Sequence, residues 1–249
     1  MIKAFAKTDV GRKRQINQDC VYACPEQVGS FSNLFILADG MGGHRAGDYA
    51  SWFLTQSLSC FIQKSKVDEP VRVFGSAIDL ANALLLEKAS SDESMAGMGS
   101  TLVIATVRDS LLICANVGDS RLYVVRGASM EQITADHSYV EEMVRLGLIE
   151  RDSEEYRMRK NIITRAVGIE KRVKPDFFDY VLEDGDYILM CSDGLTNMVG
   201  DEEIRGIITG EGSLEEKTEE LIRRANLYGG TDNISVILLA YRKGGDRNA

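Results

Sequence analysis

Four aspartates, Asp39, Asp119, Asp193 and Asp232, lie at the ends of apolar runs that are typical of buried strands. Each stands close to a glycine or an asparagine, residues that favour turns. An ionised carboxylate at the mouth of a packed core must be paired or bound to a metal. A divalent cation would relieve the repulsion among four such carboxylates, and oxygen ligands favour Mg²⁺ or Mn²⁺ over zinc. For any single aspartate, turn chemistry is the better explanation, so the metal hypothesis depends on all four.

A basic segment near the start of the chain is a second candidate for chemistry. Residues 11–19 read Gly-Arg-Lys-Arg-Gln-Ile-Asn-Gln-Asp and link the first expected strand to the next. A guanidinium in such a segment binds a phosphate through two parallel hydrogen bonds. A basic turn with a solvated face is the competing interpretation, and the segment alone does not decide between them.

The segments that carry these residues predict an α+β fold of antiparallel sheets. Runs typical of strands span 2–8, 33–38, 101–107, 111–117, 121–125, 177–181, 187–191 and 235–241. Helical spacing of apolar residues spans 46–63, 71–89, 139–147, 202–208 and 214–227. Polar breaks predict one hairpin between 101–107 and 111–117, and a second between 177–181 and 187–191. Because consecutive strands with short links pair antiparallel, the helices are expected on the outside.

Composition narrows the class of protein. The 249 residues include 29 Lys and Arg against 38 Asp and Glu, a net charge of -9, which disfavours nucleic acid as a partner. No apolar run reaches the roughly 18 residues of a membrane span, so we expect no membrane insertion. The odd number of cysteines, five, without a C-x-x-C pair predicts a reducing, cytoplasmic setting. We expect one domain over residues 1–243 and a flexible tail over 244–249.

Eight motifs in order resemble the metal-dependent Ser/Thr phosphatase family, protein phosphatase 2C, in its bacterial branch. They are G-x-x-R-x-x-N-[EQ]-D at 11–19, D-G-M-G-G at 39–43, G-S-T at 99–101, N-V-G-D-S-R at 116–121, D-H-S at 136–138, T-R-A-[LV]-G at 164–168, S-D-G-L at 192–195 and G-G-x-D-N at 229–233. Any one of them is weak evidence, but eight in the right order are specific.

The resemblance implies a fold and a set of metal ligands. The fold is a four-layer α-β-β-α sandwich of two antiparallel sheets flanked by helices, with a short mobile flap at about 139–165. The implied ligands of two or three Mn²⁺ or Mg²⁺ ions are Asp39 as the bridge, the Gly40 carbonyl, Asp193 and Asp232, Asp119 with Asp193 for a third ion, and Asp19 in the outer shell through water.

The resemblance also implies the catalytic roles. Arg14 holds the substrate phosphate, and a metal-activated water attacks phosphorus with Asp39 and Asp193 at the reaction centre. The chain departs from animal members at Met41, where they carry a histidine that resembles a general acid. The acid is therefore unassigned: His44, His137 and water are the candidates, and either histidine is equally well a structural one.

The implied activity is hydrolysis of phosphoserine and phosphothreonine in proteins. The expected partners are phosphorylated proteins, including a Ser/Thr kinase that the enzyme opposes together with that kinase's substrates, and we expect a monomer. Two alternatives stay open. One is a degenerate phosphopeptide-binding regulatory module, which should lack metal aspartates, and the other is a dinuclear-metal phosphodiesterase or nucleotide hydrolase.

Overall fold

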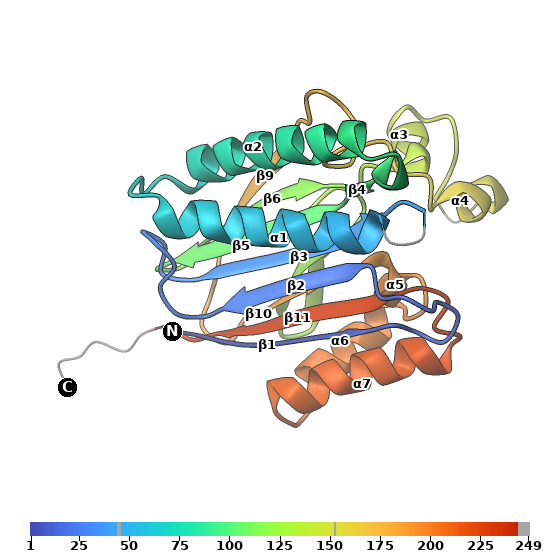
Figure 1. The fold of residues 1–249 in the computed structure, drawn as a ribbon. Coiled ribbons are helices and arrows are strands. Elements are labelled where there is room, and N and C mark those ends of the chain that lie inside the picture. Colours follow the sequence, from blue (N-terminus) through green and yellow to red (C-terminus); the bar gives the residue numbers. More distant parts are fainter. Residues whose placement is uncertain (44–45, 152, 244–249) are drawn as a thin grey trace.

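The computed structural model describes residues 1–43, 46–151 and 153–243, and it is a four-layer sandwich (Figure 1). Two antiparallel sheets lie face to face, and helices cover both outer faces, as the sequence predicts. The expected tail, residues 244–249, lies outside the described residues. None of the described helices is long and apolar enough to cross a membrane.

The first sheet joins the two ends of the chain. Its strand order is β1 (Ile2–Asp9), β11 (Ile234–Tyr241), β10 (Tyr187–Cys191), β7 (Arg121–Arg126) and β8 (Ser129–Gln132). The second sheet has the order β2 (Asp19–Cys24), β3 (Leu34–Met41), β5 (Leu102–Arg108), β6 (Leu111–Val117) and β9 (Asp176–Val181), with β4 (Gly99–Ser100) beside β3.

The continuous apolar runs in the sequence arise because the central strands are covered on both faces. In β3, Phe35 and Leu37 face the other sheet, whereas Ile36 packs into the separate core beneath the outer helices. Helices α1 (Ala46–Lys64) and α2 (Pro70–Ser91), followed by the 3₁₀ turn Glu93–Met95, supply the other side of that outer core. A strand with two buried faces loses the alternation that marks a half-exposed strand.

A third core lies under the helices of the first sheet. Helices α5 (Asp193–Thr196), α6 (Asp201–Thr209) and α7 (Leu214–Leu227) cover this sheet, and Ile204 and Leu221 pack against its strands. Helix α7 begins at a capping box in which Ser213 and Glu216 each satisfy a backbone N–H of the other. The remaining helices, α3 (Tyr139–Arg145) and α4 (Glu154–Arg159), project at the right-hand end of Figure 1.

One of the two predicted hairpins is confirmed and the other is wrong. Strands β5 and β6 pair directly through the turn at 109–110. Strand β9 pairs with β6 in one sheet, whereas β10 pairs with β7 and β11 in the other, so the turn after β9 crosses between sheets. Arg126 holds this crossing through bonds of 2.9 and 2.8 Å to the buried Asp186.

The region 149–160, which none of the predicted helices covers, contains a short helix, α4. The hydroxyl of Ser153 accepts a hydrogen bond from the N–H of Tyr156 and so caps the start of α4. No residue of α4 is buried. The helix is therefore held by its cap and by polar contacts rather than by core packing.

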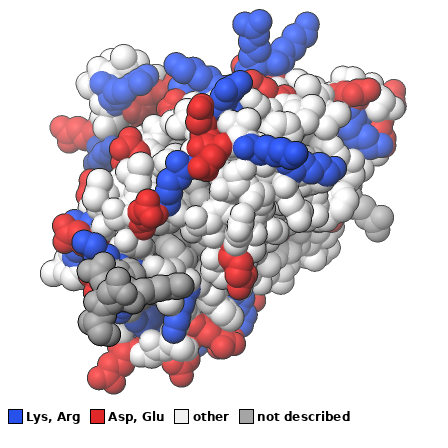
Figure 2. All heavy atoms as spheres, turned by 90° about the vertical axis from the view of Figure 1, so that its left-hand side faces the viewer, with Lys and Arg blue, Asp and Glu red and all other residues white. Residues whose placement is uncertain are grey.

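The two ends of the sandwich differ in character. The right-hand end in Figure 1 carries the start of α1, helix α5 and the projecting helices α3 and α4. Figure 2 shows the opposite end, where basic and acidic side chains are interspersed. The described residues visible on that face therefore form no continuous cationic surface of the kind that nucleic acid binding needs.

Candidate metal and phosphate site

Six of the predicted site residues converge on one cavity of about 320 Å³. The structure brings Arg14 to this cavity together with all four strand-end aspartates and Gly40. The residues that line it are Arg14, Gln18, Asp39, Gly40, Met41, Gly42, Thr101, Asp119, Asn161, Ile163, Asp193, Asp232 and Asn233. Residues far apart in the sequence thus meet because β3, β6, β10 and β11 all begin or end at this edge.

Asp39 and Asp19 are direct neighbours in the register of β2 and β3. The N–H of Asp39 donates to Thr101 Oγ1 at 3.0 Å, and its carbonyl accepts from the N–H of Thr101 at 2.8 Å. Asp19 is only 8% exposed and accepts a 2.8 Å bond from Ser192 Oγ on Oδ2. Asp19 does not line the cavity, which agrees with a position behind the ligands.

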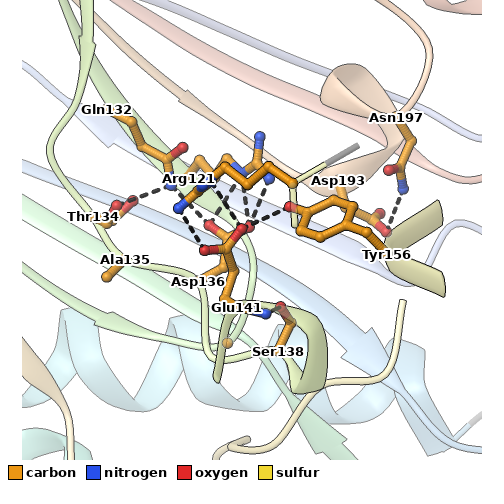
Figure 3. Close-up of polar contacts among 12 residues, drawn as sticks. Arg121, Gln132, Thr134, Ala135, Asp136, Ser138, Glu141, Tyr156, Asp193 and Asn197 are labelled. Carbon is orange, nitrogen blue, oxygen red and sulfur yellow. Dashed lines mark hydrogen bonds and ion pairs between the residues drawn. The ribbon is translucent and has the colours of Figure 1, made fainter. Parts of the chain in front are cut away.

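Asp193 opens helix α5, the short helix that follows β10. Asn197, one turn later, donates from Nδ2 to Asp193 Oδ2 at 2.9 Å (Figure 3). The other oxygen, Oδ1, is buried and has no hydrogen-bond partner among the described residues. Asp119 lies in the link that carries the chain from β6 in one sheet to β7 in the other. Asp119 and Asp193 also line an adjoining polar cavity of about 220 Å³ beside α4.

Asp232 pairs with the basic segment at the start of the chain. Arg14 Nη2 donates to Asp232 Oδ2 at 2.8 Å. The next residue, Asn233, donates to the carbonyls of Val10 and Ile16 at 2.9 and 3.0 Å, so it fixes both sides of the loop that carries Arg14. The predicted phosphate ligand and a predicted metal ligand are therefore held by one loop contact.

Burial, together with repulsion from neighbouring carboxylates, raises the pKa of Asp19, Asp39, Asp119 and Asp193. Burial followed by repulsion from Asp19 raises the pKa of Asp39 well above its usual range. Burial is also the largest cause for Asp19 and Asp119, whose pKa rises to about 7, and for Asp193, whose pKa rises to about 6. Without a counter-charge, such a cluster is electrostatically costly.

The donor set fits a hard divalent cation. Two buried carboxylate oxygens, Oδ1 of Asp19 and Oδ1 of Asp193, have no hydrogen-bond partner within the described residues. All candidate donors are oxygens, as Mg²⁺ and Mn²⁺ prefer. With the side chains in these positions, no group of three His, Cys, Asp or Glu residues in the described ranges is arranged to hold one metal ion. Asp193 and Asp232 are instead turned to Asn197 and Arg14.

The two histidine candidates for the general acid fare differently. His44 lies outside the described residues. His137 is buried and does not line the cavity: its Nδ1 accepts from the N–H of Gly118 at 3.0 Å, and its Nε2 lies 3.0 Å from Asp176. Met41 lines the cavity and has no proton to give. The placement of His137 favours a structural role, in which it braces the link that carries Asp119.

Sequence reasoning missed the side chains that position the aspartates. Asn233 was interpreted only as a turn former and a motif residue. Asn197 was not singled out, although an asparagine four residues after Asp193 on a helix is a readable signal. Two motif residues to which no role was given, Arg121 and Asp136, form a bidentate pair with bonds of 2.7–3.0 Å (Figure 3). This pair joins the start of β7 to the segment that leads into α3.

The pattern that describes protein phosphatase 2C matches residues 22–234. The chain belongs to the protein phosphatase 2C family. Protein phosphatase PhpP of Streptococcus pneumoniae is 41% identical to this 2C phosphatase over 236 residues, which are 94% of this chain and 95% of PhpP. A serine/threonine phosphatase structure from S. agalactiae has a TM-score of 0.90 and 36% identity, covering 96% of this chain and 99% of that one.

Family membership makes the chain a phosphoprotein phosphatase, a hydrolase of a metal-dependent family. The catalytic domain of the phosphatase PstP, solved in complex with two manganese ions, has a TM-score of 0.84 and 30% identity to this 2C phosphatase. The match covers 96% of this chain and 97% of the solved catalytic domain. The match supports the phosphatase over both alternatives, the regulatory module and the phosphodiesterase.

Proposed function

We propose that this 2C phosphatase hydrolyses phosphoserine and phosphothreonine in proteins with the help of divalent cations held in the 320 Å³ cavity. The observation that supports this most is the convergence of four aspartates on that cavity, beside two buried carboxylate oxygens that lack partners. A buried cluster of acceptors without donors needs a cation to balance it.

The donors divide naturally among two or three ions of Mn²⁺ or Mg²⁺. In this assignment Asp39 would be shared between two ions, the Gly40 carbonyl would bind one of them, and Asp193 with Asp232 would bind the other. Asp119 would act with Asp193 if a third ion were held, and Asp19 would act from behind through water. When bound, these cations supply Lewis-acid polarisation of the phosphoryl group and activation of an attacking water.

Arg14 orients the substrate in this proposal. Its side chain is 49% exposed at the cavity, so the guanidinium is accessible to a phosphate from solvent. The present ion pair with Asp232 is part-exposed, and such pairs contribute about 0–1 kcal/mol, so exchanging a carboxylate for a phosphate costs little. Two parallel N–H donors then fix the phosphate and stabilise the charge on its oxygens during transfer.

The leaving serine or threonine oxygen takes its proton from water in this scheme. Met41 has no proton to donate, and none of the described residues that line the cavity is a histidine. A water molecule can fill this role because the cavity is open to solvent at Arg14. His44 stays an untested candidate.

We propose the segment 139–165 as the flap over this cavity. Two of its residues, Asn161 and Ile163, line the cavity. Only Val140 is buried within α3, and no residue is buried within α4. Few buried contacts mean a low cost of local opening, which suits a segment that must admit and release substrates.

The biological setting proposed for the enzyme follows from its chemistry. A protein phosphatase needs phosphorylated proteins, and the reaction that supplies them is that of a Ser/Thr kinase. The described structure contains five free cysteines, which suits a reducing, cytoplasmic setting. We propose that the enzyme works as a monomer with a single catalytic domain over residues 1–243.

Phosphate release from a phosphothreonine peptide, compared with cleavage of bis(p-nitrophenyl) phosphate, tests the proposed function. We expect release from the peptide with Mn²⁺ or Mg²⁺, and a much lower rate on the diester. Hydrolysis of the diester alone would favour a phosphodiesterase. Tight binding of the peptide without release, in folded protein with metal bound, would favour a regulatory module.

A further inference from the structure

A groove runs away from the catalytic cavity along the last residues of the flap and the segment that follows it. It has a volume of about 400 Å³ and shares Met41 and Ile163 with the catalytic cavity. A substrate whose phosphorylated residue lies in the catalytic cavity can therefore extend directly into the groove. The far wall is formed by nine residues of the segment 163–174, and none of them is among the metal or phosphate ligands assigned above.

The groove wall is fixed to the catalytic site by hydrogen bonds. Val167 and Ser100 exchange two backbone bonds of 2.9 Å, and Ser100 Oγ donates to the carbonyl of Asp39 at 3.0 Å. Asn82 on α2 clamps the same wall, since its Oδ1 accepts from the N–H of Gly168 at 2.7 Å and its Nδ2 donates to the carbonyl of Glu170 at 2.9 Å. The groove is therefore preformed relative to Asp39, which lowers the cost of binding.

One part of the wall is apolar and open to solvent. Ile169 is 45% exposed and its side chain lies over Gly99, where any side chain at position 99 would collide with it. Val173 and the shared Met41 and Ile163 extend this apolar surface towards the catalytic cavity. A preformed, exposed apolar pocket beside a reaction centre suits one apolar side chain of a substrate.

The outer part of the wall is cationic. Arg172 and Lys174 line the groove, are exposed, and form no ion pair in the described part of the chain. Arg165, which also lines it, is engaged with Asp176 at 3.3 Å. Glu170 is the one acidic residue in the described lining. The excess of cations selects for an acidic side chain on whatever occupies the groove.

We propose that this groove is a specificity site for the chain segment next to the phosphorylated residue, and that it selects an apolar side chain flanked by an acidic one. The proposal rests on the proposed function, because a substrate reaches the groove only when its phosphorylated residue lies in the catalytic cavity. The apolar side chain packs against Ile169 and Val173, and the acidic one faces Arg172 and Lys174.

Steady-state hydrolysis of synthetic phosphothreonine peptides tests the substrate preference. The peptides form two pairs. In the first pair the varied positions lie two to four residues after the phosphothreonine, and in the second pair they lie before it. One peptide of each pair has Leu-Glu at these positions, and the other has Ala-Lys. In one of the two directions, we expect kcat/KM to be about tenfold higher for Leu-Glu than for Ala-Lys, because one well-placed side chain in a pocket gives discrimination of this order. Equal kcat/KM for both peptides in both directions would overturn the proposal.

Charge reversal on the protein locates the preference in the groove. In the double variant Arg172→Glu with Lys174→Glu, the preference for the acidic peptide should vanish or reverse. Lys171→Glu is the matched control, because Lys171 is an exposed neighbour that does not line the groove, and it should leave the preference intact. If the control and the double variant changed the peptide preference equally, the preference would come from general electrostatic attraction. The groove would then not be the specificity site, and the proposal would be overturned.

A small substrate separates failure of the groove from failure of the enzyme. p-Nitrophenyl phosphate has no flanking chain, so its metal-dependent hydrolysis should be the same in wild type and in both variants. If wild type hydrolysed neither this substrate nor any peptide, the proposed function itself would be wrong. If it hydrolysed all of them without preference, only the groove proposal would fall.

Discussion

Arg14 Nη2 lies 2.8 Å from Asp232 Oδ2, so the residue proposed to hold the substrate phosphate is ion-paired with a residue proposed to hold a metal. The two belong to opposite ends of the chain, 218 positions apart. Asn233 strengthens this link by bonding both sides of the loop that carries Arg14. If the proposed roles of the two residues hold, phosphate binding and metal binding are coupled through this single contact at the rim of the cavity.

Arg14→Ala should raise KM for a phosphothreonine peptide by about tenfold or more, with a smaller loss in kcat. The guanidinium contributes binding to substrate and transition state alike, and such a loss appears mainly in KM. Arg14→Lys should recover part of the affinity, since a point charge lacks the two parallel donors. Steady-state kinetics at saturating Mn²⁺ measure both effects. Unchanged kinetic constants in Arg14→Ala would mean that the arginine is only a surface charge.

Gly194→Ala should destabilise the protein and weaken the site together. A side chain at position 194 would collide with the carbonyl oxygen of Asn233, next to both Asp193 and Asp232. Overpacking of this kind costs about 1–3 kcal/mol or more. Gly206→Ala in helix α6 is the control, because a side chain there meets open space and alanine favours the helix by up to about 1 kcal/mol. Urea unfolding compares the two, and equal stabilities would contradict the close packing at Gly194.

The stability of the protein should fall below about pH 6.5 through His137. Burial lowers the pKa of this histidine, and Arg165 lowers it further, while Asp176 and Asp136 oppose them only in part. A lowered pKa in the folded state means that the unfolded chain binds the proton more readily, so the stabilisation present above the unfolded pKa is lost as the pH falls.

His137→Asn should remove this pH dependence, because Asn keeps an acceptor for the N–H of Gly118 but does not titrate. Urea unfolding at pH 7.5 and 5.5 measures the effect in both proteins. The free energy of unfolding should drop more in wild type than in the variant, since other groups titrate alike in both. A parallel drop would contradict a neutral, buried His137.

Tyr156→Phe should loosen the proposed flap without unfolding the enzyme. The Tyr156 hydroxyl donates to Glu141 Oε1 at 2.6 Å and so joins α4 to α3, and burial followed by this bond raises the pKa of Tyr156 to about 12. Loss of one such bond costs about 0.5–3 kcal/mol locally. Limited trypsin digestion should cleave near Arg157 several-fold faster in the variant. Tyr228→Phe, which removes a hydroxyl from the residue directly after α7, is the control and should leave this cleavage unchanged.

The sequence predicted most of the elements and the whole set of candidate aspartates because both depend on local chemistry. Asp39 and Asp193 stand out as charges at the ends of fully apolar runs, and such runs form buried strands wherever they pack. The predicted hairpin after β9 failed because a turn signals only that the chain reverses. Whether the reversed strand pairs with its neighbour or crosses to another sheet depends on partners such as β6 and β11, which are distant in sequence.

The parts of the site that could not be predicted are contacts between distant residues. The Asn233 side chain bonds the loop that carries Arg14, and the Asn82 side chain bonds the groove wall. Both contacts depend on packing between distant segments, which no local pattern encodes. His137 is the reverse case: a histidine in a motif is chemically able to act as an acid, but its bonds to Gly118 and Asp176 engage both ring nitrogens.

The most direct test is phosphate release from a phosphothreonine peptide by wild type and Asp193→Asn, with EDTA and then with increasing Mn²⁺. We predict that wild type is inactive in EDTA and active with Mn²⁺, and that the variant loses at least about 100-fold in kcat. In EDTA the variant should melt no lower than wild type, because it removes one of several repelling carboxylates. Mn²⁺ should raise its melting temperature less than that of wild type. Wild-type turnover in EDTA, or full activity in Asp193→Asn, would contradict the account.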